Sequence, residues 1–269
     1  MVSFNSGLCA STVLLVVQVA LAAVTLPPIH GRFDYQIGGN YTPKSDVAIV
    51  ARDKSAPRAS KIYSICYINA FQTQPNEKEF WTSKYSDLLL KNSNGELIED
   101  PEWEDEYIFD TSVDEKRTAL FGIVKKWIDE CAKKEYNAIE PDNLDSYTRS
   151  ENLLTKENNL AFAKQLATYA HSRNLAFAQK NDATVTKKEA KNVGFDFGIV
   201  EECQPNEECG KYDAVYGDQW IEIEYTDSDD ADKVFSDACA ARGSRISLIQ
   251  RDRNVTKPSD SEYVYNICP

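Results

Sequence analysis

Short apolar runs recur along the chain from residue 33 onward and alternate with polar segments. Their length, and their content of β-branched and aromatic residues, is typical of buried strands. Eight strands are therefore predicted, over residues 33–37, 47–52, 61–68, 137–140, 175–180, 195–201, 220–225 and 246–251.

Helical periodicity appears between the later strands, over residues 114–133, 155–172 and 229–242. The first helix opens with acidic residues, the second with Thr155 as a cap, and the third ends at Gly243. Strands that alternate with helices form a parallel sheet, and eight such strands in one domain predict an α/β fold, a single (β/α)8 TIM barrel. Residues 69–109 are expected to form an elaborated loop and helix.

The first twenty-nine residues contain no Asp, Glu, Lys or Arg, and residues 14–24 form a short apolar run. This run is too short to span a bilayer, and Ala20-Leu21-Ala22 fits the small-x-small pattern of a cleavage site. We expect a signal peptide over residues 1–22, an extension over 23–31 and one domain over 32–269. The mature protein should be secreted and extracellular, with no membrane partner.

The charge and the histidine content of the chain limit the functions that it can have. The 269 residues include 43 acidic and 30 basic side chains, a formal net charge of −13, which makes nucleic acid a poor partner. His30 and His171 are the only histidines, which argues against three-histidine zinc sites and Ser-His-Asp triads. We therefore expect a monomer without cofactor or metal that works through carboxylates, amides, Lys or Tyr.

Six cysteines follow the signal peptide, and secretion favours disulfides among them. Six cysteines allow fifteen pairings. The six-residue step from Cys203 to Cys209 favours a bond between them, and Cys239 with Cys268 would fix the C-terminus. Asn40 and Asn254 lie in glycosylation sequons, which predicts a glycoprotein with both asparagines on surface loops.

Polar residues share one parity on several predicted strands, and apolar residues the other. If the large apolar residues face the surrounding helices, the polar ones point into the barrel. This rule turns Asp142, Lys180, Glu202 and Glu224 inward at the carboxyl ends of their strands, where barrel enzymes keep their active sites. It also turns Asp34 and Gln36 inward, together with Glu140 and Glu222.

Asp142 and Glu202 follow the fourth and sixth predicted strands, with Lys180 on the strand between them. Neighbouring strands are about 4.8 Å apart, so these two backbones should lie roughly 10 Å apart with their side chains converging. Two carboxylates at that reach are what glycoside hydrolysis requires. Lys180 should hold Asp142 ionised, and Glu202 beside Glu201 and Val200 should keep its proton, which favours a retaining mechanism.

Several motifs together resemble glycoside hydrolase family 114, whose members are known as endo-α-1,4-polygalactosaminidases. They are Phe33-Asp34-Tyr35-Gln36-Ile37-Gly38-Gly39, Ile65-Cys66-Tyr67-Ile68, Glu140-Pro141-Asp142-Asn143-Leu144-Asp145-Ser146-Tyr147, Lys180-Asn181, Glu201-Glu202-Cys203 with Cys209, and Glu222-Ile223-Glu224-Tyr225. The resemblance runs in order over residues 32–252. It departs after Tyr67, where residues 69–72 stand in place of a Gly-containing polar turn followed by an acidic residue.

The resemblance implies a barrel enzyme that cleaves α-1,4-linked galactosamine polymers, with Asp142 as nucleophile and Glu202 as general acid/base. An acidic protein would attract such a polymer when its amines are free and cationic. From the resemblance and the strand ends together we expect a substrate site made of Asp34, Gln36, Tyr67, Asn143, Asp145, Tyr147, Lys180, Asn181, Glu201, Glu224 and Tyr225.

Two other functions compete with this interpretation. A non-catalytic carbohydrate-binding barrel would keep the fold without turnover, but such a protein has no need of both Asp142 and Glu202. A carboxylate-bridged metal hydrolase would need His or clustered Asp ligands, of which the chain has few, and would lose activity to a chelator.

Overall fold

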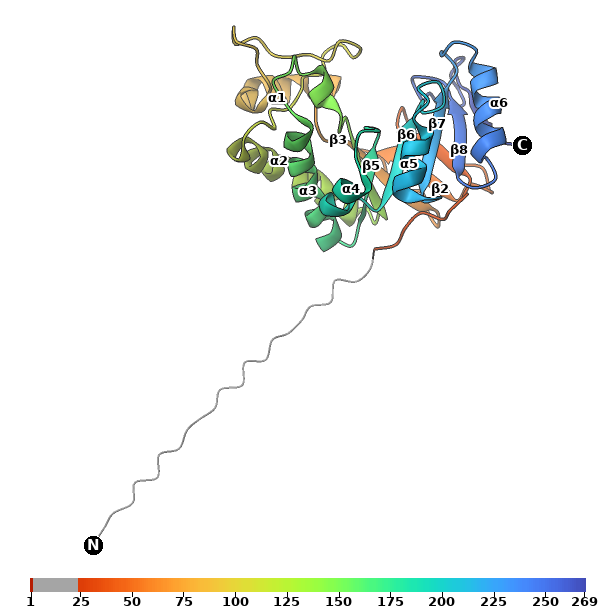
Figure 1. Cartoon of the computed structure of the whole chain (residues 1–269), viewed down its shortest axis with the longest axis horizontal. Helices are drawn as coiled ribbons and strands as arrows, with labels where there is room; N and C mark the ends of the chain where they lie inside the picture. Colours follow the sequence, from red (N-terminus) through yellow and green to blue (C-terminus); the bar gives the residue numbers. More distant parts are fainter. Residues whose placement is uncertain (2–23) are drawn as a thin grey trace.

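The computed structural model describes Met1 and residues 24–269. Eight parallel strands follow one another in sequence order around a barrel (Figure 1), and each overlaps a predicted strand. The predicted (β/α)8 barrel is therefore confirmed, whereas the predicted signal peptide lies almost entirely outside the described residues. The strands are β1 (Phe33–Gln36), β2 (Ile49–Asp53), β3 (Tyr63–Asn69), β4 (Ala138–Asp142), β5 (Ala176–Lys180), β6 (Phe197–Glu201), β7 (Trp220–Tyr225) and β8 (Ser247–Arg251).

Helices follow β3 and each later strand up to β7. They are α1 (Lys78–Lys84), α2 (Asp114–Lys133), α3 (Lys156–Ser172), α4 (Lys187–Val193), α5 (Cys209–Tyr216) and α6 (Ala231–Arg242), with short 3₁₀ turns at Pro75–Glu77, Ser86–Leu88 and Ser146–Arg149. The three predicted helices are confirmed as α2, α3 and α6. Helices α4 and α5 have seven and eight residues, too few for a helical period to stand out in the sequence. None of the described helices is long and apolar enough to cross a membrane.

The barrel is closed at its seam by side chains and a ninth strand. Strand β9 (Tyr265–Ile267) pairs antiparallel with β8, and no backbone ladder joins β1 to β8 within the described chain. Instead, the buried Arg251 side chain donates to the Tyr35 carbonyl, and the Tyr265 hydroxyl donates to the Phe33 carbonyl at 2.8 Å. Sequence periodicity gave no sign of β9, because three residues are too few.

Large apolar side chains fill the inside of the barrel as well as its outside. Phe33 and Tyr35 of β1, Phe197 and Ile199 of β6, and Ile221 and Ile223 of β7 pack together in the interior, next to Ala138, Ala176 and Ala178. The inward rule based on apolar size is therefore wrong for β1, β6 and β7, because the interior of a closed barrel is itself a packed core. It is right for β4 and β5, whose inner residues below the polar ones are alanines.

An insertion between β3 and α2, residues 70–113, extends over one side of the barrel mouth, and we call it the arm. It contains α1 and isolated antiparallel bridges such as Gln72 with Ile108 and Glu99 with Tyr107. The arm is anchored by Trp81, which is fully buried with its ring centroid 4.4 Å from that of Phe109. Figure 1 shows α1 at the upper left, above α2.

Three disulfides link all six cysteines of the described chain. Cys203 bonds to Cys209 and Cys239 to Cys268, the two pairs that the sequence favoured, and Cys66 of β3 bonds to Cys131 of α2. Gly243 follows α6 without a left-handed conformation. A Cβ there would lie 2.7 Å from the Cys268 sulfur, so close approach to the disulfide, and not helix capping, requires the glycine.

Disulfide loop length predicts unequal contributions to stability. The Cys66–Cys131 bond spans 65 residues and the Cys203–Cys209 bond spans 6. In the chain-entropy model these bonds contribute about 4 and about 2 kcal/mol, because the longer loop restricts the unfolded chain more. Denaturant unfolding of C66A/C131A and C203A/C209A should therefore show the larger loss for the first pair. Equal losses, or a larger one for the second, would contradict this.

Candidate active site

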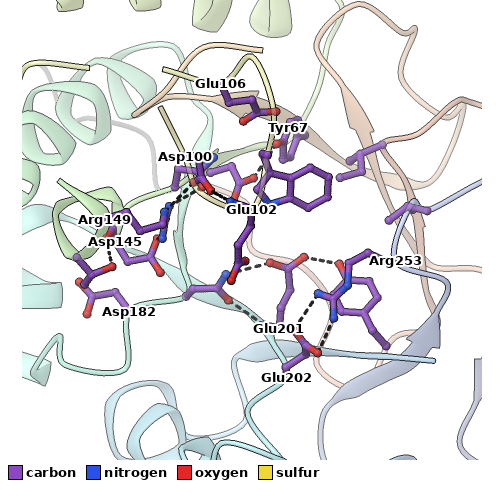
Figure 2. A pocket seen from close by; sticks show the side chains of 18 of the residues that line it. Tyr67, Asp100, Glu102, Glu106, Asp145, Arg149, Asp182, Glu201, Glu202 and Arg253 are labelled. Carbon is purple, nitrogen blue, oxygen red and sulfur yellow. Dashed lines mark hydrogen bonds and ion pairs between the residues drawn. The ribbon is translucent and has the colours of Figure 1, made fainter. Parts of the chain in front are cut away.

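A cleft of about 560 Å³ opens at the carboxyl ends of the strands (Figure 2). Its walls come from the arm, from the loops after β4, β5 and β6, and from the loop after β8. Of the predicted site residues, nine line it: Tyr67, Asp142, Asn143, Asp145, Tyr147, Asn181, Glu201, Glu202 and Tyr225.

The Lys180 ammonium lies beneath the floor of this cleft and is fully buried. Its Nζ is 2.9 Å from Glu140 Oε1, 3.2 Å from Asp142 Oδ1 and 3.3 Å from Glu201 Oε2. Burial lowers the pKa of Lys180, but the charges of Asp142, Glu140 and Glu201 outweigh burial and hold it well above its usual value. One permanent cation on β5 is therefore shared by three carboxylates, two from β4 and one from β6.

Asp142 ends β4 and points into the cleft next to Tyr67. The Tyr67 hydroxyl donates to Asp142 Oδ2 at 2.7 Å. Burial raises the pKa of Asp142, but the Lys180 charge, the Tyr67 hydrogen bond and the backbone N–H of Asn143 together bring it below the usual value. Asp142 is thus an ionised carboxylate at neutral pH with one face open to the cleft.

Glu201 ends β6 and shares the inward parity of Phe197 and Ile199. Asn181 donates to its Oε2 at 2.9 Å, and the Tyr225 hydroxyl donates to its Oε1. The Glu201 backbone N–H in turn donates to Asn181 Oδ1 at 2.8 Å, which fixes both residues. Glu201 lines the cleft, and Figure 2 shows its side chain among the residues of the cleft wall.

Glu202 has a different environment from the one predicted. The expectation that it shares the inward parity of Gly198 and Val200 is wrong, because Val200 packs on the helix side with Trp220 and Leu248. Glu202 has a left-handed backbone, φ 55°, and turns its side chain to the cleft rim. There Arg253 binds both of its oxygens, at 2.7 and 2.8 Å, so neither oxygen is free of the guanidinium.

Three other residues predicted to line the site lie outside the cleft. Asp34 and Gln36 face the outside of β1, where Asp34 accepts from Tyr41 at 2.6 Å and Gln36 accepts from Arg52 at 2.9 Å. Glu224 lies on the helix side of β7, where it accepts from the Gln204 backbone N–H at 3.1 Å. Their parity was wrong for the same reason: the inner positions of β1 and β7 hold Tyr35 and Tyr225.

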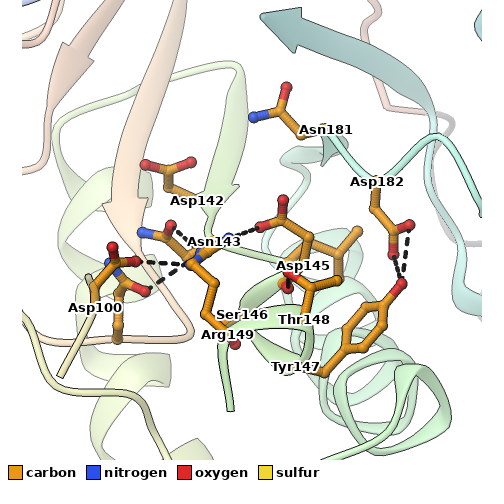
Figure 3. Close-up of polar contacts among 12 residues, drawn as sticks. Asp100, Asp142, Asn143, Asp145, Ser146, Tyr147, Thr148, Arg149, Asn181 and Asp182 are labelled. Carbon is orange, nitrogen blue, oxygen red and sulfur yellow. Dashed lines mark hydrogen bonds and ion pairs between the residues drawn. The ribbon is translucent and has the colours of Figure 1, made fainter. Parts of the chain in front are cut away.

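The loop after β4 forms a polar network along one wall of the cleft (Figure 3). Arg149 lies between Asp100 of the arm, at 2.7 Å, and Asp145, at 3.1 Å. It also donates to Asn143 Oδ1 at 2.9 Å, which places Asn143 beside Asp142. Tyr147 donates to Asp182 after β5, at 3.2 Å, so this wall is tied to both the arm and the next loop.

Comparison with known proteins assigns the family. The family model of glycoside hydrolase family GH114 matches residues 15–269. The chain belongs to family GH114. It is therefore a glycoside hydrolase, and the sequence-based assignment to this family is confirmed.

Two solved structures show the same fold as this GH114 chain. Ega3 of Aspergillus fumigatus, in complex with galactosamine, has 21% sequence identity and a TM-score of 0.69, covering 92% of this chain and 100% of its own. The glycoside hydrolase domain of PelA from Pseudomonas aeruginosa has 13% identity and a TM-score of 0.57, covering 90% and 98%. A search of curated proteins gives no match.

Several cleft residues of this GH114 enzyme were missed by sequence reasoning. The arm contributes Asp100, Glu102 and Glu106, and the loop after β8 contributes Arg253. Burial raises the pKa of Glu106 to about 7, although Gln72 and Asn69 donate to it. The only signal was the acidic run within the insertion, which could not show that the arm folds back over the cleft.

Metal ligation has little support in the described residues. The one group of candidate ligands whose atoms lie close together is Cys203, Cys209 and Glu222. Both sulfurs form a disulfide with each other, and Arg242 binds Glu222 at 2.7 Å. This group is therefore already satisfied by protein partners.

The buried Glu224 carboxyl should make stability depend on pH. Burial raises its pKa from 4.5 to about 8, with the nearby charges of Glu222 and Glu202 adding to the effect. The folded state thus binds this proton more tightly than the unfolded state. Its contribution is complete below about pH 4.5 and is lost as pH rises through about 8.

We therefore expect Glu224→Gln to gain about 4 kcal/mol in unfolding free energy relative to the parent protein between pH 5 and pH 9. Glutamine keeps an oxygen for the Gln204 N–H and carries no charge. Denaturant unfolding at both pH values measures the difference. Parallel pH dependence of the two proteins would show that Glu224 does not titrate in this range.

Proposed function

We propose that this GH114 protein is a secreted, endo-acting hydrolase of α-1,4-linked galactosamine polymers that works by a retaining mechanism. The observation that carries the proposal is the pair Asp142 and Glu201, which converge in one cleft over a shared ammonium, Lys180. We propose this pair in place of Asp142 and Glu202, because Glu202 is engaged by Arg253 at the rim.

The separation of the two carboxylates favours retention. Because Asp142 Oδ1 and Glu201 Oε2 lie 3.2 and 3.3 Å from the same Nζ, they are separated by no more than the sum of these distances. Carboxyl groups of retaining glycosidases are about 5–5.5 Å apart, and those of inverting enzymes about 6.5–9.5 Å apart, to admit a water. The shared ammonium therefore supports the shorter class.

The surroundings of the two residues support distinct roles. Asp142, whose pKa is below its usual value, attacks the anomeric carbon while Glu201 protonates the glycosidic oxygen, so the carbon–oxygen bond breaks and a glycosyl ester forms on Asp142. Glu201, now a base, then takes a proton from water, which attacks the same carbon and releases Asp142. Asn181 and Tyr225 keep Glu201 in place during both steps.

The charge of the cleft supports a substrate with free amines. Its cations are already matched: Arg149 by Asp100 and Asp145, and Arg253 by Glu202 and Asp227. The arm adds Glu102 and Glu106, which form no ion pair within the described chain; Glu106, with a pKa of about 7, is partly ionised at neutral pH. A cationic galactosamine polymer would offset this negative charge, and galactosamine is the ligand in the Ega3 structure.

Endo action and secretion have separate support. The cleft extends from Trp103 of the arm, which is 44% exposed, to Asn254 after β8, so an extended polymer has wall residues on both sides of the carboxylate pair. The three disulfides fit an oxidising compartment. Asn40 and Asn254, the proposed glycan sites, are both exposed.

The first test compares two neighbouring glutamates. Asp142→Asn and Glu201→Gln should each lower the rate on partially deacetylated galactosamine polymer by at least about 100-fold, because each removes a group that takes part in bond breaking. Glu202→Gln is the matched control and should lose less than about tenfold, since Glu202 acts at the rim. Product release measured by mass spectrometry reports all three.

Azide resolves the roles of the pair. With an activated aryl glycoside of a galactosamine oligomer, azide should restore turnover in Glu201→Ala with a retained glycosyl azide as product. Rescue in an Asp142 variant should give the inverted azide. A large loss in Glu202→Gln with full activity in Glu201→Gln would replace Glu201 by Glu202, and binding without turnover in the parent protein would favour a carbohydrate-binding barrel.

The second test concerns the amines of the substrate. The fully acetylated polymer should be cleaved at least about tenfold more slowly than the deacetylated one, and raising ionic strength from about 0.05 to 0.5 M should weaken only the latter. Initial rates at low substrate concentration measure both effects. Equal rates on the two polymers would remove the charge argument without affecting the carboxylate pair.

A further inference from the structure

We propose that Glu140 is a positioning residue that shares the charge of Lys180 with the two cleft carboxylates, so that Glu201 keeps the proton that cleavage requires. This inference depends on the proposed function, because it assigns Glu201 as the proton donor. Glu140 itself does not line the cleft and touches no substrate.

Glu140 lies below the cleft floor and is fully buried. Its Oε1 accepts two hydrogen bonds, from the Tyr35 hydroxyl and from Lys180 Nζ, both at 2.9 Å. Lys180 also donates to the Tyr35 hydroxyl at 3.0 Å, which closes a triangle of three polar groups. The second oxygen, Oε2, is buried and has no hydrogen-bond partner among the residues that the structure describes.

That unpartnered oxygen is costly if the residue serves only to hold the barrel together. A buried carboxylate oxygen without a donor loses its hydration without compensation. Glutamine at this position could keep both hydrogen bonds of Oε1 and would carry no charge. What glutamate provides here and glutamine would not is a negative charge, and that charge lies against Lys180.

Lys180 of β5 and the charged and titratable groups around it come from six strands. They are Tyr35 of β1, Tyr67 of β3, Glu140 and Asp142 of β4, Lys180 of β5, Glu201 of β6 and Tyr225 of β7. The remaining two strands add Asp53 and Arg251, which are engaged elsewhere: Asp53 accepts from Ser55, and Arg251 donates at the seam. Within residues 24–269, Lys180 is thus the only cation that faces three carboxylates.

The three carboxylates differ in what else holds their charge. Asp142 also has the Tyr67 hydroxyl and a backbone N–H, which favour its ionised form. Burial raises the pKa of Glu140, and Lys180 offsets part of that effect. Glu201 accepts from Asn181 and Tyr225 and also lies against Lys180. Because Glu140 takes up part of the ammonium's charge and adds a negative charge of its own, it weakens the attraction of Lys180 for the negative charge of Glu201.

Removing the charge of Glu140 should therefore release more of the Lys180 field onto Asp142 and Glu201. In Glu140→Gln we expect the basic limb of the pH–rate profile, where the general acid loses its proton, to move to lower pH by about 1 unit. Tyr35→Phe is the matched control, since it removes a hydrogen bond to Glu140 without changing charge. Its basic limb should stay in place even if its rate falls.

Carbon-13 NMR titration of the Asp142 and Glu201 carboxyl carbons tests the same effect without turnover. Their titration midpoints should move to lower pH in Glu140→Gln and stay in place in Tyr35→Phe, with thermal melting to verify that both variants are folded. Unchanged midpoints in folded Glu140→Gln would overturn the inference. If the parent protein cleaves no galactosamine polymer but Glu140→Gln still shifts the midpoints, the proposed function is wrong while the electrostatic role of Glu140 is supported.

Discussion

The ammonium of Lys180 lies among three carboxylates of β4 and β6 at the carboxyl ends of the strands, and the arrangement of the site depends on it. Burying one charge is expensive unless partners surround it closely. The partners can do so only because Ala138, Ala176 and Ala178 leave the inner layer below them small. The inner residues below the charged layer are thus small on β4 and β5 and large on β1, β6 and β7.

Much of the fold could be predicted from sequence, because strand and long-helix patterns depend on local composition. The eight strands and the helices α2, α3 and α6 are of this kind. Which face of each strand points into the barrel was harder to predict. On β4 and β5, one side of each strand is small or polar, so the size of the apolar residues identifies the helix side; on β6, Phe197, Ile199 and Val200 are apolar on both sides, so no local signal distinguishes them.

The same ambiguity separates the two adjacent glutamates of the site. Glu201 is the last residue of β6, so its side chain points inward like that of Ile199. Glu202 follows the strand and has a left-handed backbone conformation. A single residue of register decides which one meets Lys180. Glu106 of the arm and Arg253 after β8 could not be predicted as site residues for another reason. They meet the site only through tertiary contacts, which no local sequence pattern encodes.

The contacts that close the seam between β1 and β8 also affect the charged layer around Lys180. The side chains that close it, Arg251 and Tyr265, and the strand that covers it, β9, all come from the last twenty residues of the chain. Tyr35, which donates to Glu140, lies on the strand at that seam. The Arg251–Tyr35 contact joins residues 216 positions apart in the sequence. The position of Tyr35 beside Glu140 therefore depends on a contact between the first and the last parallel strand, and a substitution at the seam can disturb the charged layer without touching it.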